Sequence, residues 1–290
     1  MGTGTVLEVV RPGPLTTVQD LGRRGVAHLG VPRAGALDAP ALRAANRLVG
    51  NEPGAAALET TLGGVAVRAD GPVLVAVTGA PCEVRVNGRP AAWGAPVAVP
   101  AGGLLEVGAA VHGVRGYLAV AGGIAVPPVL GSRSADLLSG LGPAPLAGGD
   151  RLPVGPRPAY RPLPELVPLP APPTELVLRL QLGPRADWFA PQAVARLAGA
   201  PYRVAPASNR IALRTDGPAV PRARAGELPS EGMVLGAVQI PPDGLPVVFL
   251  ADHPTTGGYP VLGVVPPADL AAAAQARPGT PVRFVPMRGR

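Results

Sequence analysis

The chain has 290 residues, of which 47% are hydrophobic and 16% charged, and it contains a single cysteine. A chain of this length can build a hydrophobic core without disulfide or metal cross-links. Cys82 excludes an internal disulfide and any site made of several cysteines. All 26 basic residues are arginines. A phosphate-binding P-loop, Schiff-base chemistry and biotin attachment are excluded because each needs a lysine.

The net charge of +7 does not indicate a nucleic-acid-binding protein. The arginines are scattered, with no basic run longer than Arg23-Arg24, and only 3% of residues are aromatic. We therefore expect no nucleic-acid partner, although small anionic ligands suit such a chain. No apolar run reaches the roughly 20 residues of a membrane helix. The three histidines lack metal-ligand spacing, and the lone cysteine fits a cytoplasmic protein.

Short apolar runs alternate with glycine- and proline-rich turns along the chain, a pattern typical of β-sandwiches and barrels. Asn87-Gly88 is the strongest hairpin signal. The expected strands cover residues 72–77, 83–86, 97–99, 104–107, 116–120, 176–182, 234–240, 247–250 and 282–285. We expect three helices, at 39–49 after a cap at Asp38, at about 188–197, and at 268–277.

Residues 155–174 are so rich in proline that neither a helix interior nor a central strand fits there. This segment is typical of an extended linker or a strap across a surface. We therefore expect an N-terminal β lobe at 1–155, a proline-rich linker or strap at 156–174, and a C-terminal β lobe at 175–290.

Two polar segments precede the first helix. Residues 12–24 place Gln19 and Asp20 beside two threonines, which fits a binding loop or a strand that enters a turn capped by Asp20. Residues 30–38 form a tight glycine-containing loop, which could present helix N–H groups to an anion or could simply connect two elements. Both interpretations stay open for each segment.

Two more polar segments lie in the C-terminal part. Arg210 offers a planar fork to a carboxylate or phosphate, and Glu231 could be its ion-pair partner, a base or a surface charge. In residues 239–260, Asp252 follows an apolar run and precedes two threonines and two glycines, as in loops that present a base beside backbone N–H groups. We predict that this loop and Arg210 form one cavity for a small charged molecule.

Seven stretches across both lobes form a recognisable set, namely RPGPLTTVQDLGRRGVAHLGVPRAGALD, ANRLVGNEPGAAALE, GYLAVAGGI, LGSRSADLLSGLG, SNR, SEGMVLGAVQIPPDGLP and LADHPTTGGYP. In sequence and in order, they resemble the family that contains the C subunit of 5-oxoprolinase. This family is also called the KipA or allophanate hydrolase subunit 2 family, and it is related to biotin-dependent carboxyltransferases. The resemblance implies a mainly β, two-lobed architecture of cyclophilin-like β-barrels with a few short helices.

The resemblance also implies a function. Such a chain would be a subunit of an ATP-dependent 5-oxoprolinase that hydrolyses 5-oxo-L-proline to L-glutamate. It would act with a KipI-like and a LamB/YcsF-like partner, with ATP bound by this chain or by a partner and no tightly bound metal. We expect the chain to be inactive alone. Two alternatives are a biotin-dependent carboxyltransferase for a urea-like acceptor, and a non-enzymatic KipA-like regulator that binds a KipI-like kinase inhibitor.

Site residues carry over from matching family motifs. The motifs mark a shared pocket but assign no catalytic roles. For this pocket we expect substrate binding by Thr17, Gln19, Asp20, Asp38, Thr255, Thr256, Gly257, Gly258 and Tyr259. We expect catalytic roles for Gln239, for Arg210 as the holder of an anionic group, and for Asp252 as a base or an orienting carboxylate. Pro254 departs from the family, which has a glutamine at this position, so one potential ligand contact is absent.

Overall fold

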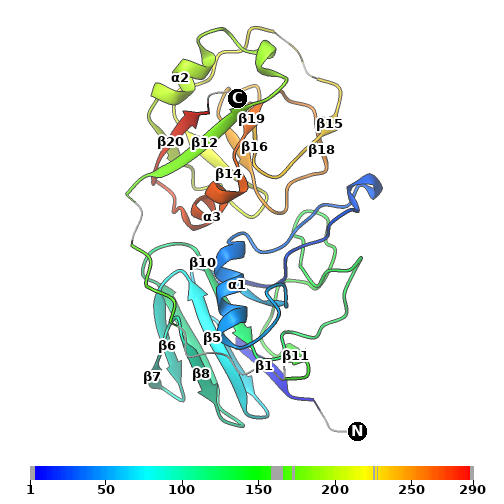
Figure 1. The fold of residues 1–290 in the computed structure, drawn as a ribbon, viewed down its shortest axis with the longest axis vertical. Coiled ribbons are helices and arrows are strands. Elements are labelled where there is room, and N and C mark those ends of the chain that lie inside the picture. Colours follow the sequence, from blue (N-terminus) through cyan, green and yellow to red (C-terminus); the bar gives the residue numbers. More distant parts are fainter. Residues whose placement is uncertain (1–3, 158–165, 172–173, 225, 227, 288–290) are drawn as a thin grey trace. The chain divides into compact units, whose positions relative to one another are not determined.

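The computed structural model describes residues 4–157, 166–171, 174–224, 226 and 228–287, and its fold is mainly β, as the sequence predicts (Figure 1). The chain divides into two compact units. The first consists of Met1–Arg23, Ala34–Asp136 and Gly140–Pro172, and the second of Arg24–Arg33, Leu137–Ser139 and Pro173–Arg290. Part of the expected proline-rich linker, at 158–165 and 172–173, lies outside the described residues.

The first unit contains two antiparallel sheets, with strand orders β11-β1-β4-β9-β6-β7 and β2-β3-β10-β5-β8. Its elements are β1 (Val6–Arg11), β2 (Leu15–Gln19), α1 (Ala39–Leu48), β3 (Ala57–Thr61), β4 (Ala66–Ala69), β5 (Val73–Gly79), β6 (Cys82–Val86), β7 (Arg89–Ala91), β8 (Pro96–Val99), β9 (Leu104–Ala110), β10 (Arg115–Val120) and β11 (Arg151–Pro153). The expected hairpin joins β6 to β7, and both of its turn residues have positive φ, as a type I′ turn requires.

The five-stranded sheet is buried on both faces because its side chains alternate between two apolar clusters. In β5, Val75 and Val77 belong to a core that contains residues from both sheets. The intervening Ala76 belongs to a second cluster with Leu42 and Leu48 of α1, which covers the other face of the sheet (Figure 1). The alanines at positions 57, 76 and 119 belong to the same cluster, and their small side chains allow the helix to pack closely against the sheet.

The second unit contains a closed barrel with the strand order β12-β19-β16-β17-β14-β13-β20. Its elements are η1 (Ala27–Leu29), β12 (Leu176–Leu182), η2 (Ala186–Trp188), α2 (Ala193–Gly199), β13 (Tyr202–Val204), β14 (Ala212–Asp216), β15 (Glu231–Gly232), β16 (Ala237–Gln239), β17 (Val247–Phe249), β18 (Thr256–Gly257), β19 (Val261–Val264), α3 (Pro267–Gln275) and β20 (Pro281–Pro286). Parallel pairing of β12 with β20 closes the barrel. The short strands β15 and β18 form a separate ribbon.

Two sequence predictions in this unit are wrong in detail. The strand expected at 234–240 begins only at Ala237, because Gly236 has a φ of +84°, which lies outside the β region. A side chain at Gly236 would also lie 2.3 Å from the carbonyl oxygen of Val265. The helix expected at 188–197 is replaced by η2 and α2, which are separated by Pro191. Proline disfavours helical backbone in the residue before it. Within the described residues, no helix is long and apolar enough to cross a membrane.

Candidate functional site

Asp20 is the centre of a buried hydrogen-bond network at the end of β2. Its Oδ1 accepts from the hydroxyls of Ser132 and Ser134, each at 2.6 Å, and from the N–H of Gly22 at 2.8 Å. Its Oδ2 accepts from the N–H of Arg133 at 2.7 Å. A carboxylate has about four lone-pair sites. The carboxylate of Asp20 therefore holds the 132–134 loop in place. The four hydrogen bonds that it accepts equal the number of its lone-pair sites.

Gln19 precedes this carboxylate and is completely buried. Its Nε2 donates to the hydroxyl of Thr17 and to the carbonyl oxygen of Ala135, both at 3.0 Å. Because that carbonyl can only accept, the atom facing it must be the amide nitrogen. The Oε1 of Gln19 is buried and has no hydrogen-bond partner among the described residues. A buried polar atom without a partner is uncommon, and contact with a bound ligand is one explanation for it.

Asp38 caps α1, as predicted, because its carboxylate accepts from the N–H of Ala41 at 3.0 Å. A buried Glu59 on β3, which the sequence analysis missed, supports the preceding loop. Its Oε2 accepts from the N–H of Leu37 at 2.9 Å and from the hydroxyl of Tyr117 at 2.7 Å. That hydroxyl in turn accepts from the N–H of Asp38 at 2.7 Å. The only sequence signal for Glu59 is one acid within a short apolar run.

Burial raises the pKa of Tyr117 well above its usual value, and the neighbouring negative charges of Glu59 and Asp38 add to the effect. The phenol therefore stays protonated at neutral pH and can donate to Glu59. The same loop also lies against the loop of Asp20, since the N–H of Ala36 donates to the carbonyl oxygen of Asp20 at 2.9 Å. The first unit thus brings Thr17, Gln19, Asp20 and Asp38 into one polar region.

In the second unit, Arg210 and Asp252 form a two-point ion pair. The Nε of Arg210 donates to Oδ2 and the Nη2 donates to Oδ1, both at 2.8 Å. The two side chains are 1% and 0% exposed. The N–H of Leu137, in a segment that clusters with this unit, also approaches Oδ2 at 3.3 Å. The arginine and the loop after β17 are therefore close together, and the anionic group that Arg210 holds in this structure is Asp252.

The structure corrects the partner suggested for Arg210. Glu231 on β15 instead accepts from Arg185, whose Nε and Nη2 lie 3.0 and 2.9 Å from its Oε2. Glu231 is therefore not the partner of Arg210, but belongs to a separate and partly exposed ion pair.

The segment 255–260 is held in place by hydrogen bonds to its backbone. Gly257 pairs with Glu231 in the β15–β18 ribbon, and the N–H of Met233 donates to the carbonyl oxygen of Thr255 at 2.9 Å. Gln239 is buried, and its Nε2 donates to the carbonyl oxygen of Tyr259 at 3.1 Å. A Cβ at Gly257 would lie 2.9 Å from that Nε2, so any larger residue at this position would push the Gln239 side chain aside.

Other members of the predicted segment occupy defined places. The N–H of Leu228 donates to the carbonyl oxygen of Gly258 at 3.0 Å. Thr256 is exposed on β18 and faces Gly232 in the ribbon. The Nδ1 of the buried His253 lies 2.7 Å from the carbonyl oxygen of Pro254 and must carry a proton, since the carbonyl only accepts. The loop is thus ordered by contacts within the second unit.

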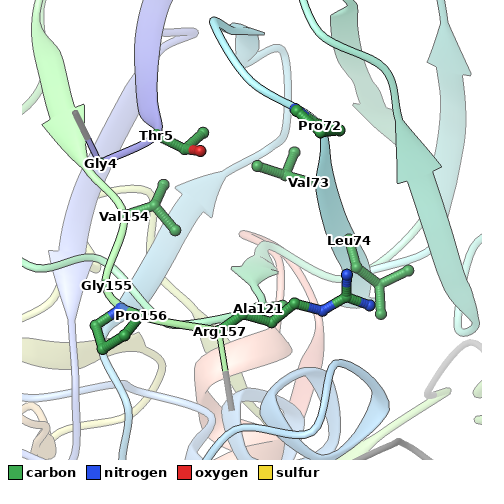
Figure 2. Close-up of a pocket in the computed structure, with 10 residues that line it drawn as sticks. All are labelled: Gly4, Thr5, Pro72, Val73, Leu74, Ala121, Val154, Gly155, Pro156 and Arg157. Carbon is green, nitrogen blue, oxygen red and sulfur yellow. The ribbon is translucent and has the colours of Figure 1, made fainter. Parts of the chain in front are cut away.

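A separate hollow of about 500 Å³ lies in the first unit (Figure 2). It is lined by Gly4, Thr5, Pro72, Val73, Leu74, Ala121, Val154, Gly155, Pro156 and Arg157. Its walls are mainly apolar, with a threonine hydroxyl and one guanidinium among the lining side chains (Figure 2). None of the predicted site residues lines it. Within the described part of the chain, no three His, Cys, Asp or Glu side chains gather as a metal-binding group.

The family model and the most similar curated proteins indicate the same family of carboxyltransferase domains. The model of the carboxyltransferase domain, subdomain A and B, matches residues 29–286. The C subunit of 5-oxoprolinase from Escherichia coli is 40% identical over 97% of this chain and 91% of its own length. The urea amidolyase of Lachancea kluyveri is 35% identical over 97% of this chain, but the match spans only 17% of that relative.

Solved structures agree with these matches. The crystal structure of TTHA0988 superposes with a TM-score of 0.89 at 40% identity and covers 98% of this chain, which spans 57% of that protein. The K. lactis urea amidolyase superposes with a TM-score of 0.90 at 30% identity and covers 99% of this chain, which spans 19% of that protein. The chain therefore belongs to the carboxyltransferase domain family, subdomains A and B.

Proposed function

We propose that this chain is a subunit of an ATP-dependent 5-oxoprolinase, which hydrolyses 5-oxo-L-proline to L-glutamate. The observation that carries the proposal is the match to the C subunit of 5-oxoprolinase, which is 40% identical and spans nearly the whole of both chains. The urea amidolyase match covers only a small part of a much longer protein. The two proposed partners are a KipI-like protein and a LamB/YcsF-like protein, and all three act in the cytoplasm.

The chemistry explains the need for ATP. A lactam is an amide and resists attack by water at neutral pH. Phosphorylation of its carbonyl oxygen by ATP would give an electrophilic carbon and a phosphate leaving group. Water attack at that carbon and cleavage of the ring C–N bond would then yield glutamate, ADP and phosphate. We place the ATP site on one of the partners, because this chain has no lysine and no glycine-rich phosphate loop.

Within this chain, we assign substrate binding to the polar region of Thr17, Gln19, Asp20 and Asp38. Gln19 supports this assignment because its buried Oε1 has no partner among the described residues. Asp20 would contribute indirectly, since its oxygens already accept four hydrogen bonds. Asp38 would contribute by fixing the start of α1.

We assign an orienting role, rather than that of a base, to Asp252. Both of its oxygens accept from Arg210, so the carboxylate has little capacity to receive a proton from water. Arg210 would hold Asp252, and Gln239 would hold the Tyr259 backbone, so that the side chains and backbone of 255–259 keep a fixed shape for ligand contact.

Reconstitution tests the proposal. The purified chain is mixed with the KipI-like and LamB/YcsF-like partners, ATP and 5-oxo-L-proline, and glutamate and ADP are measured together. We expect glutamate release, matched by ADP, only when all three proteins are present. A stable complex that releases no glutamate would favour the regulator. Carboxylation of urea by this chain with a biotin carboxylase and carrier would favour the carboxyltransferase.

A further inference from the structure

Arg23 is a buried cation without an acidic partner in the described part of the chain. It is 2% exposed. The Nε donates to the carbonyl oxygen of Val129 at 3.1 Å, and the Nη2 donates to that of Ser134 at 2.6 Å. The Nη1 is buried and makes no hydrogen bond to any described residue. Burying a charge without a counter-ion is costly, so this arrangement calls for an explanation.

The nearest acid in sequence does not neutralise this cation. Asp20 lies three residues before Arg23, but its two oxygens accept from two serine hydroxyls and two backbone N–H groups. The same 132–134 segment therefore binds the acid and the base separately. Asp20 sets the shape of the segment, and the segment's carbonyl at Ser134 holds the guanidinium of Arg23.

Gln19 leaves a complementary group unused. Its Nε2 donates to the carbonyl oxygen of Ala135, the residue after the one that binds Arg23. Two adjacent carbonyls thus hold the two side chains. Among the residues that the structure describes, the acceptor Oε1 of Gln19 and the donor Nη1 of Arg23 have no hydrogen-bond partner.

The guanidinium is also held firmly in place. Gly142 has a φ of +84°, and a side chain there would lie 2.8 Å from the Nη2 of Arg23 and 2.2 Å from the carbonyl oxygen of Ser134. The turn at 140–142 therefore lies directly against the guanidinium. An arginine fixed in this way loses little conformational entropy when it binds an anion.

We propose that Arg23 and Gln19 form a subsite for a ligand that carries a carboxylate beside an N–H donor. The Nη1 of Arg23 donates to the carboxylate, and the Oε1 of Gln19 accepts from the N–H. For the function proposed above, on which this identification rests, these groups are the carboxylate and the lactam N–H of 5-oxo-L-proline. Urea has the N–H donor but no carboxylate. Because Nη1 is buried, the ligand can reach it only when part of the surrounding chain moves, and we expect the 140–142 turn to move because it lies against the same guanidinium.

Isothermal titration of the full chain, alone and in the three-protein complex, tests the subsite. The probes are 5-oxo-L-proline, 2-pyrrolidinone, which is the same lactam without the carboxylate, and inorganic phosphate at matched ionic strength. We expect 5-oxo-L-proline to bind at least 10-fold more tightly than 2-pyrrolidinone. Arg23→Gln should abolish this preference, and Gln19→Ala should weaken both lactams. Arg24→Gln is the matched control, because it removes the same charge from an exposed neighbour.

Equal binding of the two lactams, or binding of neither, by the wild-type chain and complex would overturn the proposal without any variant. Loss of the preference in Arg24→Gln as well as in Arg23→Gln would also overturn it, since the effect would then be one of net charge. So would tight binding of phosphate alone. If Arg23 had only a structural role, Arg23→Gln would lower the stability of the protein but keep the preference for 5-oxo-L-proline over 2-pyrrolidinone, and this result would also overturn the proposal. Glutamate release is measured separately, so a failure of the 5-oxoprolinase proposal and a failure of the subsite give different results.

Discussion

Replacing Asp252 with asparagine removes the negative charge from the buried ion pair and leaves its shape almost unchanged. Arg210 would then keep its charge in a place that is 1% exposed, after losing the carboxylate that accepts from its Nε and Nη2. Breaking a buried pair by removing one partner typically costs about 3–5 kcal/mol. For a folding unit of this size, that loss lowers the melting temperature by about 10 °C or more.

The same unit offers a matched control. Arg179 and Asp269 also form a two-point pair, but the arginine side chain is 49% exposed. The guanidinium lowers the pKa of Asp269, yet solvent screens this pair and keeps the arginine hydrated. We therefore expect Asp269→Asn to cost much less stability than Asp252→Asn. Any contribution from Asp269 is present above the ordinary aspartate pKa and is lost as pH falls through its lowered value.

Urea denaturation measures the difference. Tryptophan fluorescence in a Trp93→Phe background reports on Trp188, which lies in the unit that contains both pairs. The double variant Arg210→Met with Asp252→Leu should recover most of the lost stability, because it removes both buried charges. Equal losses for Asp252→Asn and Asp269→Asn would refute the reasoning. So would an Asp252→Asn protein that is fully stable but inactive, which would make Asp252 a base.

Three further predictions concern the first unit. Burial raises the pKa of Cys82 to about 11. Its thiolate fraction at neutral pH, and therefore its rate of alkylation by iodoacetamide, should be about 100-fold below that of an ordinary thiol. The free energy of unfolding should also fall as pH rises from about 9 to 11, because in this range the thiol ionises only in the unfolded chain. Tyr117→Phe removes the hydroxyl that donates to Glu59, and it should lower the free energy of unfolding by about 1–3 kcal/mol in urea denaturation. Gly142→Ala adds a methyl group 2.2 Å from the carbonyl oxygen of Ser134, so thermal melting should show a clear loss of stability.

Each of these predictions has a contrary result. Alkylation of Cys82 at the rate of a free thiol in the folded protein would contradict its burial. An unchanged unfolding free energy in Tyr117→Phe would mean that Glu59 does not depend on the phenol. Full stability of Gly142→Ala would mean that the turn does not lie against Ser134, and Gly140→Ala is the matched control because that glycine is exposed.

Local patterns predicted much of the fold. Asp38 was expected to cap a helix, and it does so through its carboxylate. The Asn87-Gly88 hairpin and the alternation of β12 were also predicted correctly, since turn chemistry and side-chain period are local properties. The two-residue strands β15 and β18 were missed because each is too short to show a period.

The site was less predictable because its contacts join distant residues. Arg210 and Asp252 are 42 positions apart, and nothing in the sequence favoured Asp252 over Glu231 as the partner. Glu59 and Tyr117 are 58 positions apart on neighbouring strands, so only their register brings the hydroxyl to the acid. In the sequence Arg23 is one of many scattered arginines, and only its burial separates it from Arg24.

The most direct measurement of the central claim is the rate of glutamate formation from 5-oxo-L-proline and ATP by the KipI-like and LamB/YcsF-like partners, with this chain present or omitted. We expect one ADP per glutamate when the chain is present, no glutamate when it is omitted, and a raised KM for 5-oxo-L-proline with Arg23→Gln but not with Arg24→Gln. Glutamate formation that does not depend on this chain, or the absence of glutamate with all three proteins in a stable complex, would contradict the proposed function.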